Sequence, residues 1–500
     1  MALFLYLKCF TIGVVSLNKE ITKRFRIGGN MAEYKPRALY GRKVIYTDLP
    51  QITNDNLIEE LEKSYSTHLI NRSDIQYLWD YYTGKQDILF RKKKVRPEIN
   101  NRIVENRANE IVAFKVGYLA GEPIQYIARK PDDIIGNQIS DLNEMMFAEN
   151  KFAKDKEVIE WGMICGTAFR MVLPDNPLDN DDAPFEIYTL DPRNTFVVQS
   201  SRLGNKRVYG ATYWLDEFNQ PHFSVYTRDK HYKVDDWRIT SVESHTLNDI
   251  PIFEYPANNA RLGSFEIVLP LLNKINNLES NRMDGIEQVV QSFMKFINVD
   301  INKDQMLEFL ELGAIKINSS NQLPADVDVV KNELDQNQSQ TIKNDTYESI
   351  LTICGMPNRN GGSSTSDTGA AVMMRDGWTL AEARAKDSET MFKQSEQDFL
   401  KLVLRITNTL TDMDLRVKDI GMQFTRRNYE AIQSKAQVLV TMLQQDKIHP
   451  QLAFSHSGMF TDPEKAYMIS MEYYKELGRQ RLDEAKQLQQ GDDLTDEQEM

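Results

Sequence analysis

The sequence predicts a mainly helical α+β fold, because long stretches of helical hydrophobic spacing flank one region of alternating residues. From Asn54 to Tyr82, apolar residues recur every four positions, which is typical of an amphipathic helix. Residues 167–260 instead carry aromatic-rich alternating runs between Asp, Asn and Gly turns. That alternation predicts an antiparallel sheet. The length of 500 residues is enough for about three domains with buried cores.

Two further helices are expected between residue 82 and the sheet. The first spans about 101–119 and is stopped by Gly121 and Pro123. The second spans about 141–163 and ends near Gly166. Four large rings in "YLWDYYTG", residues 77–84, are expected to pack in the core, with nucleic-acid stacking as the alternative.

Helical spacing returns after the sheet, over residues 263–297. Its apolar stripe consists of Val268, Leu271, Leu272, Ile275, Leu278, Ile286, Val290, Phe293 and Ile297. A unit at 298–337 interrupts the helical pattern, where "GAIKI" and "DVDVV" predict short strands beside the helix "KDQMLEFLEL". Helix is expected again from about 338 to 353.

The last third of the chain is expected to be helical as well. A long helix is predicted from Ala370 to about Leu410, with Gly377 inside it. Glycine costs about 1 kcal/mol in a helix relative to alanine, so this position is expected to kink the helix and act as a hinge. Residues 426–480 predict three short helices. The tail, 482–500, has seven acidic residues against one lysine and is expected to be disordered.

Composition excludes several classes of protein. The net charge of −13 argues against a general DNA-coating protein, which needs surplus cations to displace counterions. It remains compatible with a protein that DNA passes without binding tightly. The three cysteines, Cys9, Cys165 and Cys354, are widely spaced and suggest neither a disulfide framework nor a metal site, which fits a reducing cytoplasm.

The first thirty residues differ from the rest. The run "MALFLYLKCFTIGVVSL" suggests a signal peptide, but Lys8 interrupts it and no clear cleavage site follows. It is also too short and too interrupted for a membrane span. A third interpretation is that "RIGGNM" reflects a ribosome-binding sequence in the gene just before the Met31 codon. We therefore expect translation to start at Met31, and residues 1–30 to be a non-native or disordered extension.

The stretch "GGSSTSDTG", residues 361–369, looks at first like a phosphate-binding loop. A Walker loop requires a lysine before the Ser or Thr, and this stretch has none. No strand is expected before it, and G-x-G-x-x-G does not fit. A flexible linker and a mobile element with another role remain open.

Enzyme chemistry finds little support in the sequence. The six histidines form no H-E-x-x-H motif and do not accompany paired cysteines, and no G-x-S-x-G marks a nucleophile. We expect no catalytic residue, no cofactor and no metal. The basic run "RKKKVR", residues 91–96, is expected to be a solvated loop or to contact an acidic neighbouring subunit, with DNA phosphates as the alternative.

The order and spacing of five stretches resemble the portal proteins of tailed bacteriophages, in the branch typical of siphophages. The similarity covers about residues 55–480. The stretches are "YYTGKQDIL" (81–89), "NRIVENRANEIVAFKVGYLAGEPIQY" (101–126), "IPIFEYPANNARLGSFEIVLPLLNKINNLES" (250–280), "GGSSTSDTGAAVMMRDGWTLAEARAKDSETMF" (361–392) and "FTDPEKAYMISMEYYKE" (460–476). An unrelated helical scaffold or assembly protein and a nucleotide-dependent or nuclease enzyme are the competing readings.

The resemblance implies a portal fold: a ring, usually of twelve subunits, at one capsid vertex. In chain order, the first expected parts are a wing at 31–262, a stem helix at 263–297, a clip at 298–337 and a second stem helix at 338–356. They are followed by a tunnel loop at 357–369, a long kinked wing helix and connection at 370–425, a helical crown at 426–480 and an acidic tail at 481–500. Such a ring would be assembled in the bacterial cytoplasm and would become part of the virion.

The resemblance also implies sites and partners. The tunnel-loop residues expected to reach double-stranded DNA, independently of its sequence, are Asn358, Arg359, Asn360, Gly361, Gly362, Ser363, Ser364, Thr365 and Ser366. Glu308 and Glu311 are expected on the docking surface of the clip. The implied partners are the terminase large subunit, a head-completion or adaptor protein, the major capsid protein and scaffolding protein, with no membrane. The ATP-driven motor must be another protein, since no ATP site is evident here.

Overall fold

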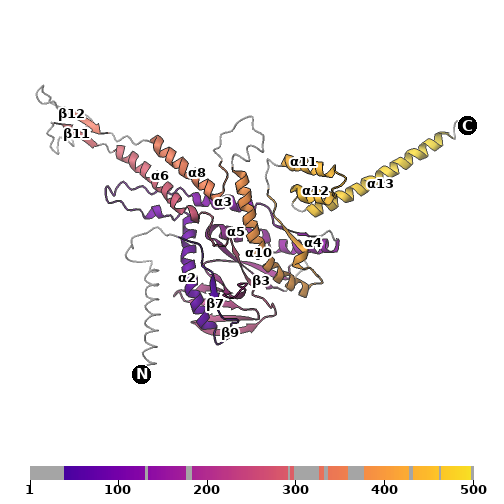
Figure 1. Ribbon diagram of the computed structural model, residues 1–500, viewed down its shortest axis with the longest axis horizontal. Helices are drawn as coiled ribbons and strands as arrows, with labels where there is room; N and C mark the ends of the chain where they lie inside the picture. Colours follow the sequence, from indigo (N-terminus) through magenta and orange to yellow (C-terminus); the bar gives the residue numbers. More distant parts are fainter. Residues whose placement is uncertain are drawn as a thin grey trace. The chain divides into compact units, whose positions relative to one another are not determined.

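The computed structural model describes residues 39–129, 133–175, 183–290, 293–297, 326–330, 336–358, 377–426, 432–460 and 463–496 (Figure 1). The chain divides into two units, 1–38 and 39–500, and every described residue belongs to the second unit. No described helix is both long enough and apolar enough to cross a membrane.

Among the described residues, four α-helices precede β3, the first strand of the three-stranded sheet along the chain. They are α2 (Leu57–Tyr82), α3 (Arg107–Leu119), α4 (Asp133–Ala148) and α5 (Lys151–Cys165). The prediction of one helix over 141–163 is wrong, because Asn150 adopts left-handed backbone angles (φ 50°) and separates α4 from α5. The helix expected from 101 begins only at Arg107, capped by the side chain of Asn106, and the residues before it are extended.

The alternating region forms the predicted antiparallel structure, divided between two sheets. The six-stranded sheet has the order β1 (Ile45–Thr47), β5 (Thr195–Ser200), β6 (Arg207–Leu215), β7 (Pro221–Tyr226), β8 (Lys230–Asp235) and β9 (Arg238–Ser244). Only the β1–β5 pair is parallel; the other pairs are antiparallel. The three-stranded sheet has the order β10 (Ile252–Pro256), β3 (Thr167–Pro174) and β4 (Phe185–Leu190).

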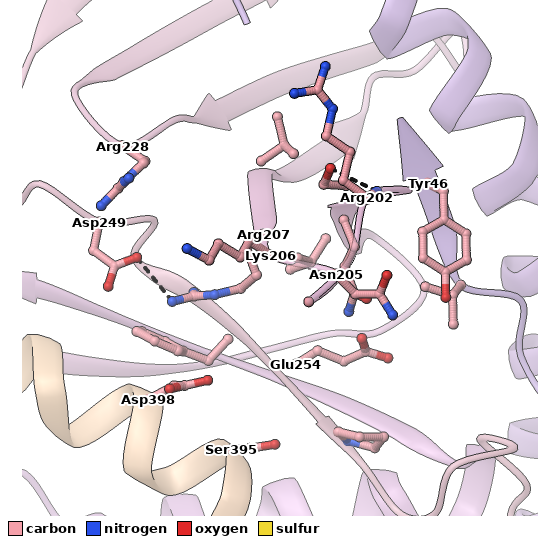
Figure 2. A pocket seen from close by; sticks show the side chains of 18 of the residues that line it. Tyr46, Arg202, Asn205, Lys206, Arg207, Arg228, Asp249, Glu254, Ser395 and Asp398 are labelled. Carbon is pink, nitrogen blue, oxygen red and sulfur yellow. Dashed lines mark hydrogen bonds and ion pairs between the residues drawn. The ribbon is translucent and has the colours of Figure 1, made fainter. Parts of the chain in front are cut away.

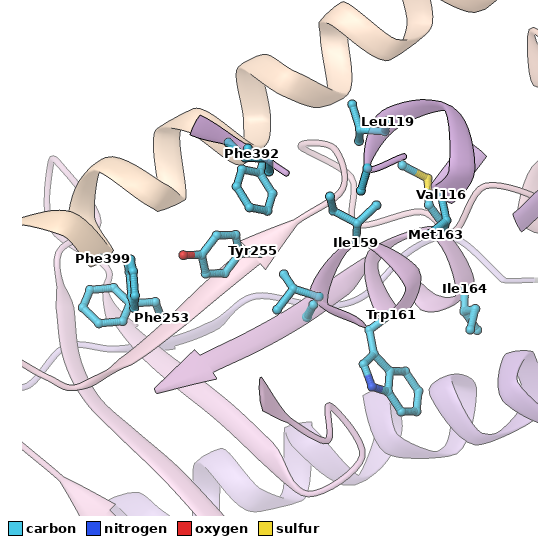
Figure 3. Packing of buried hydrophobic residues seen from close by; sticks show 14 of the residues in the cluster. Val116, Leu119, Ile159, Trp161, Met163, Ile164, Phe253, Tyr255, Phe392 and Phe399 are labelled. Atoms are coloured by element: carbon cyan, nitrogen blue, oxygen red, sulfur yellow. The ribbon is translucent and has the colours of Figure 1, made fainter. Parts of the chain in front are cut away.

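The largest hydrophobic core joins the helices to the three-stranded sheet. Figure 3 shows Phe392 and Phe399 of α10 (Trp378–Leu410) packed on Tyr255 and Phe253 of β10. The ring centroids of Phe253 and Phe399 lie 5.8 Å apart, and those of Tyr255 and Phe392 lie 5.2 Å apart. Helix α10 is therefore fixed along its second half to the centre of the molecule.

Two short sheets connect distant segments. Strand β2 (Gln125–Ala128) pairs antiparallel with β13 (Ile420–Gln423), so the chain after α10 returns to the segment after α3. Strand β11 (Phe293–Ile297) pairs antiparallel with β12 (Asp326–Val330). The strand expected at "DVDVV" is thus confirmed, whereas "GAIKI" and "KDQMLEFLEL" lie outside the described residues.

The helix expected over 263–297 is shorter than predicted. It forms as α6 (Leu269–Val290), after a 3-10 turn at Glu266–Val268. The assignment of Phe293 and Ile297 to its stripe is wrong, because both lie in β11, where Phe293 pairs with Val330. Helix α8 (Gln336–Cys354) matches the helix expected from about 338 to 353 closely.

The C-terminal region forms α11 (Ile432–Leu443), α12 (Pro450–Ser457) and α13 (Pro463–Asp496). Three helices were predicted here, but α13 is long rather than short. Helix α13 continues to Asp496, so the expectation of disorder is wrong for residues 482–496.

Candidate functional site

Helices α6 and α8 pack against each other and form the framework of the site. The Nζ atom of Lys343 on α8 lies 2.8 Å from a carboxylate oxygen of Glu279 on α6 and 3.0 Å from one of Glu105, just before α3. This one ammonium group therefore links three segments of the chain.

The hydrophobic stripe of α6 changes character along the helix. Its first part is buried in the main core, where Val268, Leu272 and Ile275 are at most 2% exposed. Farther along, Met283 is 41% and Ile286 48% exposed. The second half of α6 thus presents apolar side chains that the described residues cover only in part.

A second face of α6 holds the extended segment before α3. Asn276, Ser280 and Asp284 recur every four residues, so they lie on one face of the helix. Their side chains accept hydrogen bonds from the backbone N–H groups of Glu105, Ile103 and Asn101, at 2.8, 3.0 and 2.7 Å respectively. These contacts fix the residues that the sequence had suggested would be helical.

Asp284 also fixes the basic loop. Its carboxylate lies 3.1 Å from a guanidinium nitrogen of Arg91 and 3.0 Å from Nζ of Lys93. Burial would raise the pKa of Asp284, but the hydrogen bonds from Asn101 and Lys93 outweigh it and lower the pKa. Lys92 and Lys94 remain exposed. The loop is therefore partly neutralised within the subunit rather than fully solvated.

The two ends of the segment at 359–376 meet at one place. Met356 and Pro357 are buried at the end of α8. A Cβ atom placed on Gly377 would lie 3.6 Å from both the carbonyl oxygen of Met356 and the Cα of Pro357. Asn358 is half-buried beside a cavity of about 210 Å³ that Arg107, Phe114 and Tyr347 also line. The described residues on either side of this segment therefore lie close together.

Most of the predicted tunnel-loop and clip residues cannot be placed. Arg359, Asn360, Gly361, Gly362, Ser363, Ser364, Thr365 and Ser366 lie outside the described residues, as do Glu308 and Glu311. Only Asn358 and Gly377 can be placed, and the structure brings them to the same root of the loop.

Gly377 does not lie inside a helix, and that prediction is wrong. It is the N-cap residue of α10 and has φ +82°, a left-handed conformation that side chains with a Cβ rarely adopt. The next residue, Trp378, has its ring centroid 6.1 Å from that of Phe114 and 6.0 Å from that of Tyr118. The aromatic group therefore fixes the start of α10.

Farther along α10, a fully buried charge network holds the helix to the sheets. The Glu396 carboxylate lies 3.0 Å from Nζ of Lys151 and 3.1 Å from a guanidinium nitrogen of Arg170. Asp155 lies 2.6 Å from Lys151 and 2.5 Å from Arg170, so two cations balance two anions.

Tyr126 and Tyr255 complete this network, and each donates a hydrogen bond of 2.6 Å to Glu396. Burial would raise the pKa of Glu396, but Lys151 and Arg170 lower it to about 2. The same burial, with the neighbouring carboxylates, raises the pKa of both tyrosines far above their ordinary value. The network is therefore a fixed cross-link between α5, α10, β2, β3 and β10.

This arrangement supports a structural role. Burial raises the pKa of the Cys165 thiol to about 12 and that of Cys354 to about 11, so neither is a ready nucleophile. Within the described ranges, no group of three or more His, Cys, Asp or Glu side chains could hold a metal ion. What the described part of the site contains is the paired helices α6 and α8, the adjacent residues Met356, Pro357 and Gly377, and the long helix α10 anchored in the core.

The family described as phage portal protein, SPP1 Gp6-like, matches residues 61–494 of this sequence. The chain belongs to the phage portal protein family. As a portal protein it acts at the capsid vertex of a virion, and its family is structural rather than enzymatic. The match includes the three-stranded sheet, strands β5 to β9 of the six-stranded sheet, the α6–α8 framework and all of α10 to α12.

Solved structures similar to this portal protein come from gene transfer agent (GTA) particles. One, described as the virion of a native GTA particle, is 10% identical, covers 77% of this chain and 94% of the other, and has a TM-score of 0.43. The neck of an empty particle computed with C6 symmetry is 9% identical, with coverages of 77% and 94% and a TM-score of 0.41. The neck of a native particle computed with C12 symmetry is 11% identical, with coverages of 70% and 89% and a TM-score of 0.39. No curated protein matched.

Two features of this portal protein were missed at the level of sequence. The polar ladder on α6 has a visible signal, because Asn276, Ser280 and Asp284 recur with the helical period. The buried network had none, since Asp155, Arg170 and Glu396 are far apart in the chain and look like ordinary surface residues.

Proposed function

We propose that the chain assembles into a closed ring through which double-stranded DNA is packaged and ejected. The supporting observation is the amount of apolar surface left uncovered on its helices. Besides Met283 and Ile286, large apolar residues on α8 and α11–α13 are 43–65% exposed: Ile342, Ile353, Val438, Val440, Leu443, Leu452, Met468, Ile469, Tyr473 and Tyr474. Surfaces of this kind favour association, and neighbouring copies in a ring would cover them.

A pair of substitutions on α6 tests this proposal. Changing Met283 and Ile286 to lysine should shift full-length protein from rings toward smaller species in sedimentation velocity, because each lysine would be desolvated at the contact. The control variant changes Phe147 and Phe218, which are exposed elsewhere, to lysine and should leave assembly unchanged. Rings that persist in the α6 variant at low protein concentration would contradict this role of α6.

The parts of the chain are proposed to follow the portal plan. Residues 31–262 would form the wing, α6 and α8 the stem around the channel, 298–337 the clip, 370–425 the wing helix and connection, and 426–480 the crown. The observed β11–β12 pair supports a compact insertion between the two stem helices. Since β11 occupies residues 293–297, the first stem helix ends at 290 rather than at 297.

The clip is proposed to meet the terminase large subunit and later the head-completion proteins. Its acidic residues Glu308 and Glu311 would contribute to docking, where complementary charge mainly sets partner choice and encounter rate. Glu308→Lys should leave rings intact in sedimentation but weaken binding of the purified terminase large subunit. Unchanged terminase binding by both Glu308→Lys and Glu311→Lys would remove these side chains from the docking surface.

Residues 357–369 are proposed to form a mobile collar around the DNA. The common root at Met356, Pro357 and Gly377 supports this, since a segment anchored at both ends can move while the body stays fixed. Gly377 is then a hinge at the start of α10 rather than within it. Short Ser and Thr side chains can touch phosphates without the fixed positive charge that would retain the duplex.

A further inference from the structure

A groove of about 1310 Å³ lies between the six-stranded sheet and α10. One wall is the β5–β6 hairpin with the β7–β8 turn, and the other is the second half of α10. Figure 2 shows Arg202, Lys206 and Arg228 on the sheet side, and Ser395 and Asp398 on α10 across from them. We call this cavity the sheet–α10 groove.

Some of the charged side chains that line the sheet–α10 groove form ion pairs within it, and others do not. Asp249 lies 3.1 Å from Arg207, Glu254 lies 2.6 Å from Arg261, and Asp398 lies 2.7 Å from Lys401. These three carboxylates therefore already have cationic partners within the groove, whereas the fourth, Asp229 beside Arg228, forms no ion pair with a described residue.

Three cations of the same groove have no such partner. Arg202, Lys206 and Arg228 are exposed, and none forms an ion pair with any carboxylate of the described residues. They come from the hairpin and the turn that form one wall, so their positive charge is concentrated on one side. An occupant of the groove should therefore carry negative charge.

The backbone beside the groove favours an extended occupant. Strand β1, which contributes Tyr46 to the lining, lies at one edge of the six-stranded sheet. Strand β10, which contributes Phe253 and Glu254, lies at one edge of the three-stranded sheet. Edge strands are common sites for the addition of an extended peptide.

Two other anionic occupants fit less well. Duplex DNA carries a charge at every phosphate, and the groove offers only a small excess of cations over its carboxylates Asp229, Asp249, Glu254 and Asp398, which suits a short acidic segment better. The chain's own acidic end is continuous helix as far as Asp496, which does not match a groove bordered by two strand edges. We propose that the sheet–α10 groove binds an extended, acidic segment of a different protein of the particle.

Binding of a labelled peptide of ten glutamates to the full-length assembled protein tests this proposal. The unmodified protein should bind the peptide, and binding should weaken as salt is added. The variant Arg202→Glu, Lys206→Glu, Arg228→Glu should bind at least roughly tenfold more weakly, because attraction becomes repulsion at three positions. Fluorescence anisotropy measures both affinities, and sedimentation confirms that the assembly is intact.

A matched control separates this site from the effect of net charge. Lys156→Glu, Arg238→Glu, Lys418→Glu makes the same change in charge at exposed positions outside the groove, and should bind the peptide within about twofold of the unmodified protein. An equal loss in the control, or no loss in the groove variant, would overturn the proposal.

Two competitors distinguish the sources of negative charge. If a short DNA duplex displaces the peptide at lower concentration than unlabelled peptide does, the groove is a nucleic-acid site and the proposal fails. If a synthetic peptide of residues 482–500 binds more tightly than the glutamate peptide, the occupant is another copy of this chain, and the assignment to a different protein fails. Weaker binding of both competitors supports the proposal.

Discussion

Glu396 accepts hydrogen bonds from Arg170, Tyr126 and Tyr255 and forms an ion pair with Lys151, and all four partners come from elements other than its own. Lys151, Arg170, Tyr126 and Tyr255 surround its two carboxylate oxygens at 2.6 to 3.1 Å. Such a buried group is stable only while every partner is present, because desolvation of an unpaired charge costs more than the pair contributes. At the scale of single residues, the stability of the interior depends on each buried charge having all of its partners rather than on the number of ion pairs.

Glu396→Gln should therefore destabilise the protein strongly. The change leaves Lys151 and Arg170 with Asp155 as the remaining carboxylate, at a cost of about 3–5 kcal/mol. Scanning calorimetry of the assembled protein should show a clearly lowered unfolding midpoint. Asp398→Asn on the same helix removes an exposed partner of Lys401 and should cost at most about 1 kcal/mol. Equal shifts for the two variants would contradict the role given to the network.

His68 predicts a pH dependence of stability. It is buried on α2, stacked on Phe196, with its Nε2 3.1 Å from the carbonyl oxygen of Arg193. Burial lowers its pKa to about 4, from 6.5. Below pH 6.5 the unfolded chain binds a proton that the folded chain does not bind, so stability falls as the pH drops toward 4, by about 3 kcal/mol in all.

Calorimetry between pH 7 and pH 4 checks this expectation. Replacement His68→Gln retains a donor for the Arg193 carbonyl but no longer titrates, so its midpoint should change less with pH than that of the unmodified protein. Parallel curves for the two proteins over this interval would show that His68 does not carry the effect.

At the scale of elements, α6 has two faces with different roles. One face carries the apolar stripe, contacts α8 through Glu279 and presents Met283 and Ile286 farther along the helix, and the other holds residues 101–105 through Asn276, Ser280 and Asp284. The polar face gives the segment before α3 a fixed path although it has no regular secondary structure. The basic loop is fixed to α6 as well, because Arg91 and Lys93 form ion pairs with Asp284.

Asp284→Ala should release that segment. The buried N–H of Asn101 loses its acceptor, and Arg91 and Lys93 lose their counter-charge. Hydrogen exchange of residues 91–106 should become roughly tenfold faster, while α6 stays helical. Glu287→Ala, an exposed position on the same helix, is the control and should change exchange little. If both variants exchange alike, Asp284 does not hold the loop.

Whether a helix or strand could be predicted from the sequence depends on whether nearby residues or distant contacts determine it. Helix α8 and the alternating strands were predictable because local periodicity decides them. Phe293 and Ile297 continue the apolar spacing of α6, yet pairing with β12 across a long separation places them in a strand. Asn150 and Gly377 end or begin helices through left-handed backbone angles, which hydrophobic spacing does not report. The partners of Glu396 depend on tertiary contacts alone.

At the scale of the whole molecule, the net negative charge of the chain suits the proposed DNA channel. With a charge of −13 per chain, a ring would repel duplex DNA rather than retain it, which favours sliding. The collar at 357–369 would then approach the duplex mainly with short uncharged side chains, those of Ser363, Ser364, Thr365 and Ser366. The groove cations are a local exception, assigned to a protein partner.

Ser364→Lys with Thr365→Lys tests the collar. Each subunit gains two cations in a segment that lies outside the α6–α8 framework, so rings should still form. Added phosphate contacts make binding strongly salt-dependent, by orders of magnitude for roughly 6–10 contacts. Packaging in vitro should slow at low salt and recover partly as salt is added. Normal packaging at low salt by this variant would show that the collar does not face the DNA.

The central claim is that copies of this chain close into a ring around a channel, and electron microscopy of the purified full-length protein tests it most directly. The exposed apolar faces of α6, α8 and α11–α13 predict closed rings with a central hole wide enough for duplex DNA. A monomer that keeps its full helical content at high protein concentration, or an open filament, would contradict the account.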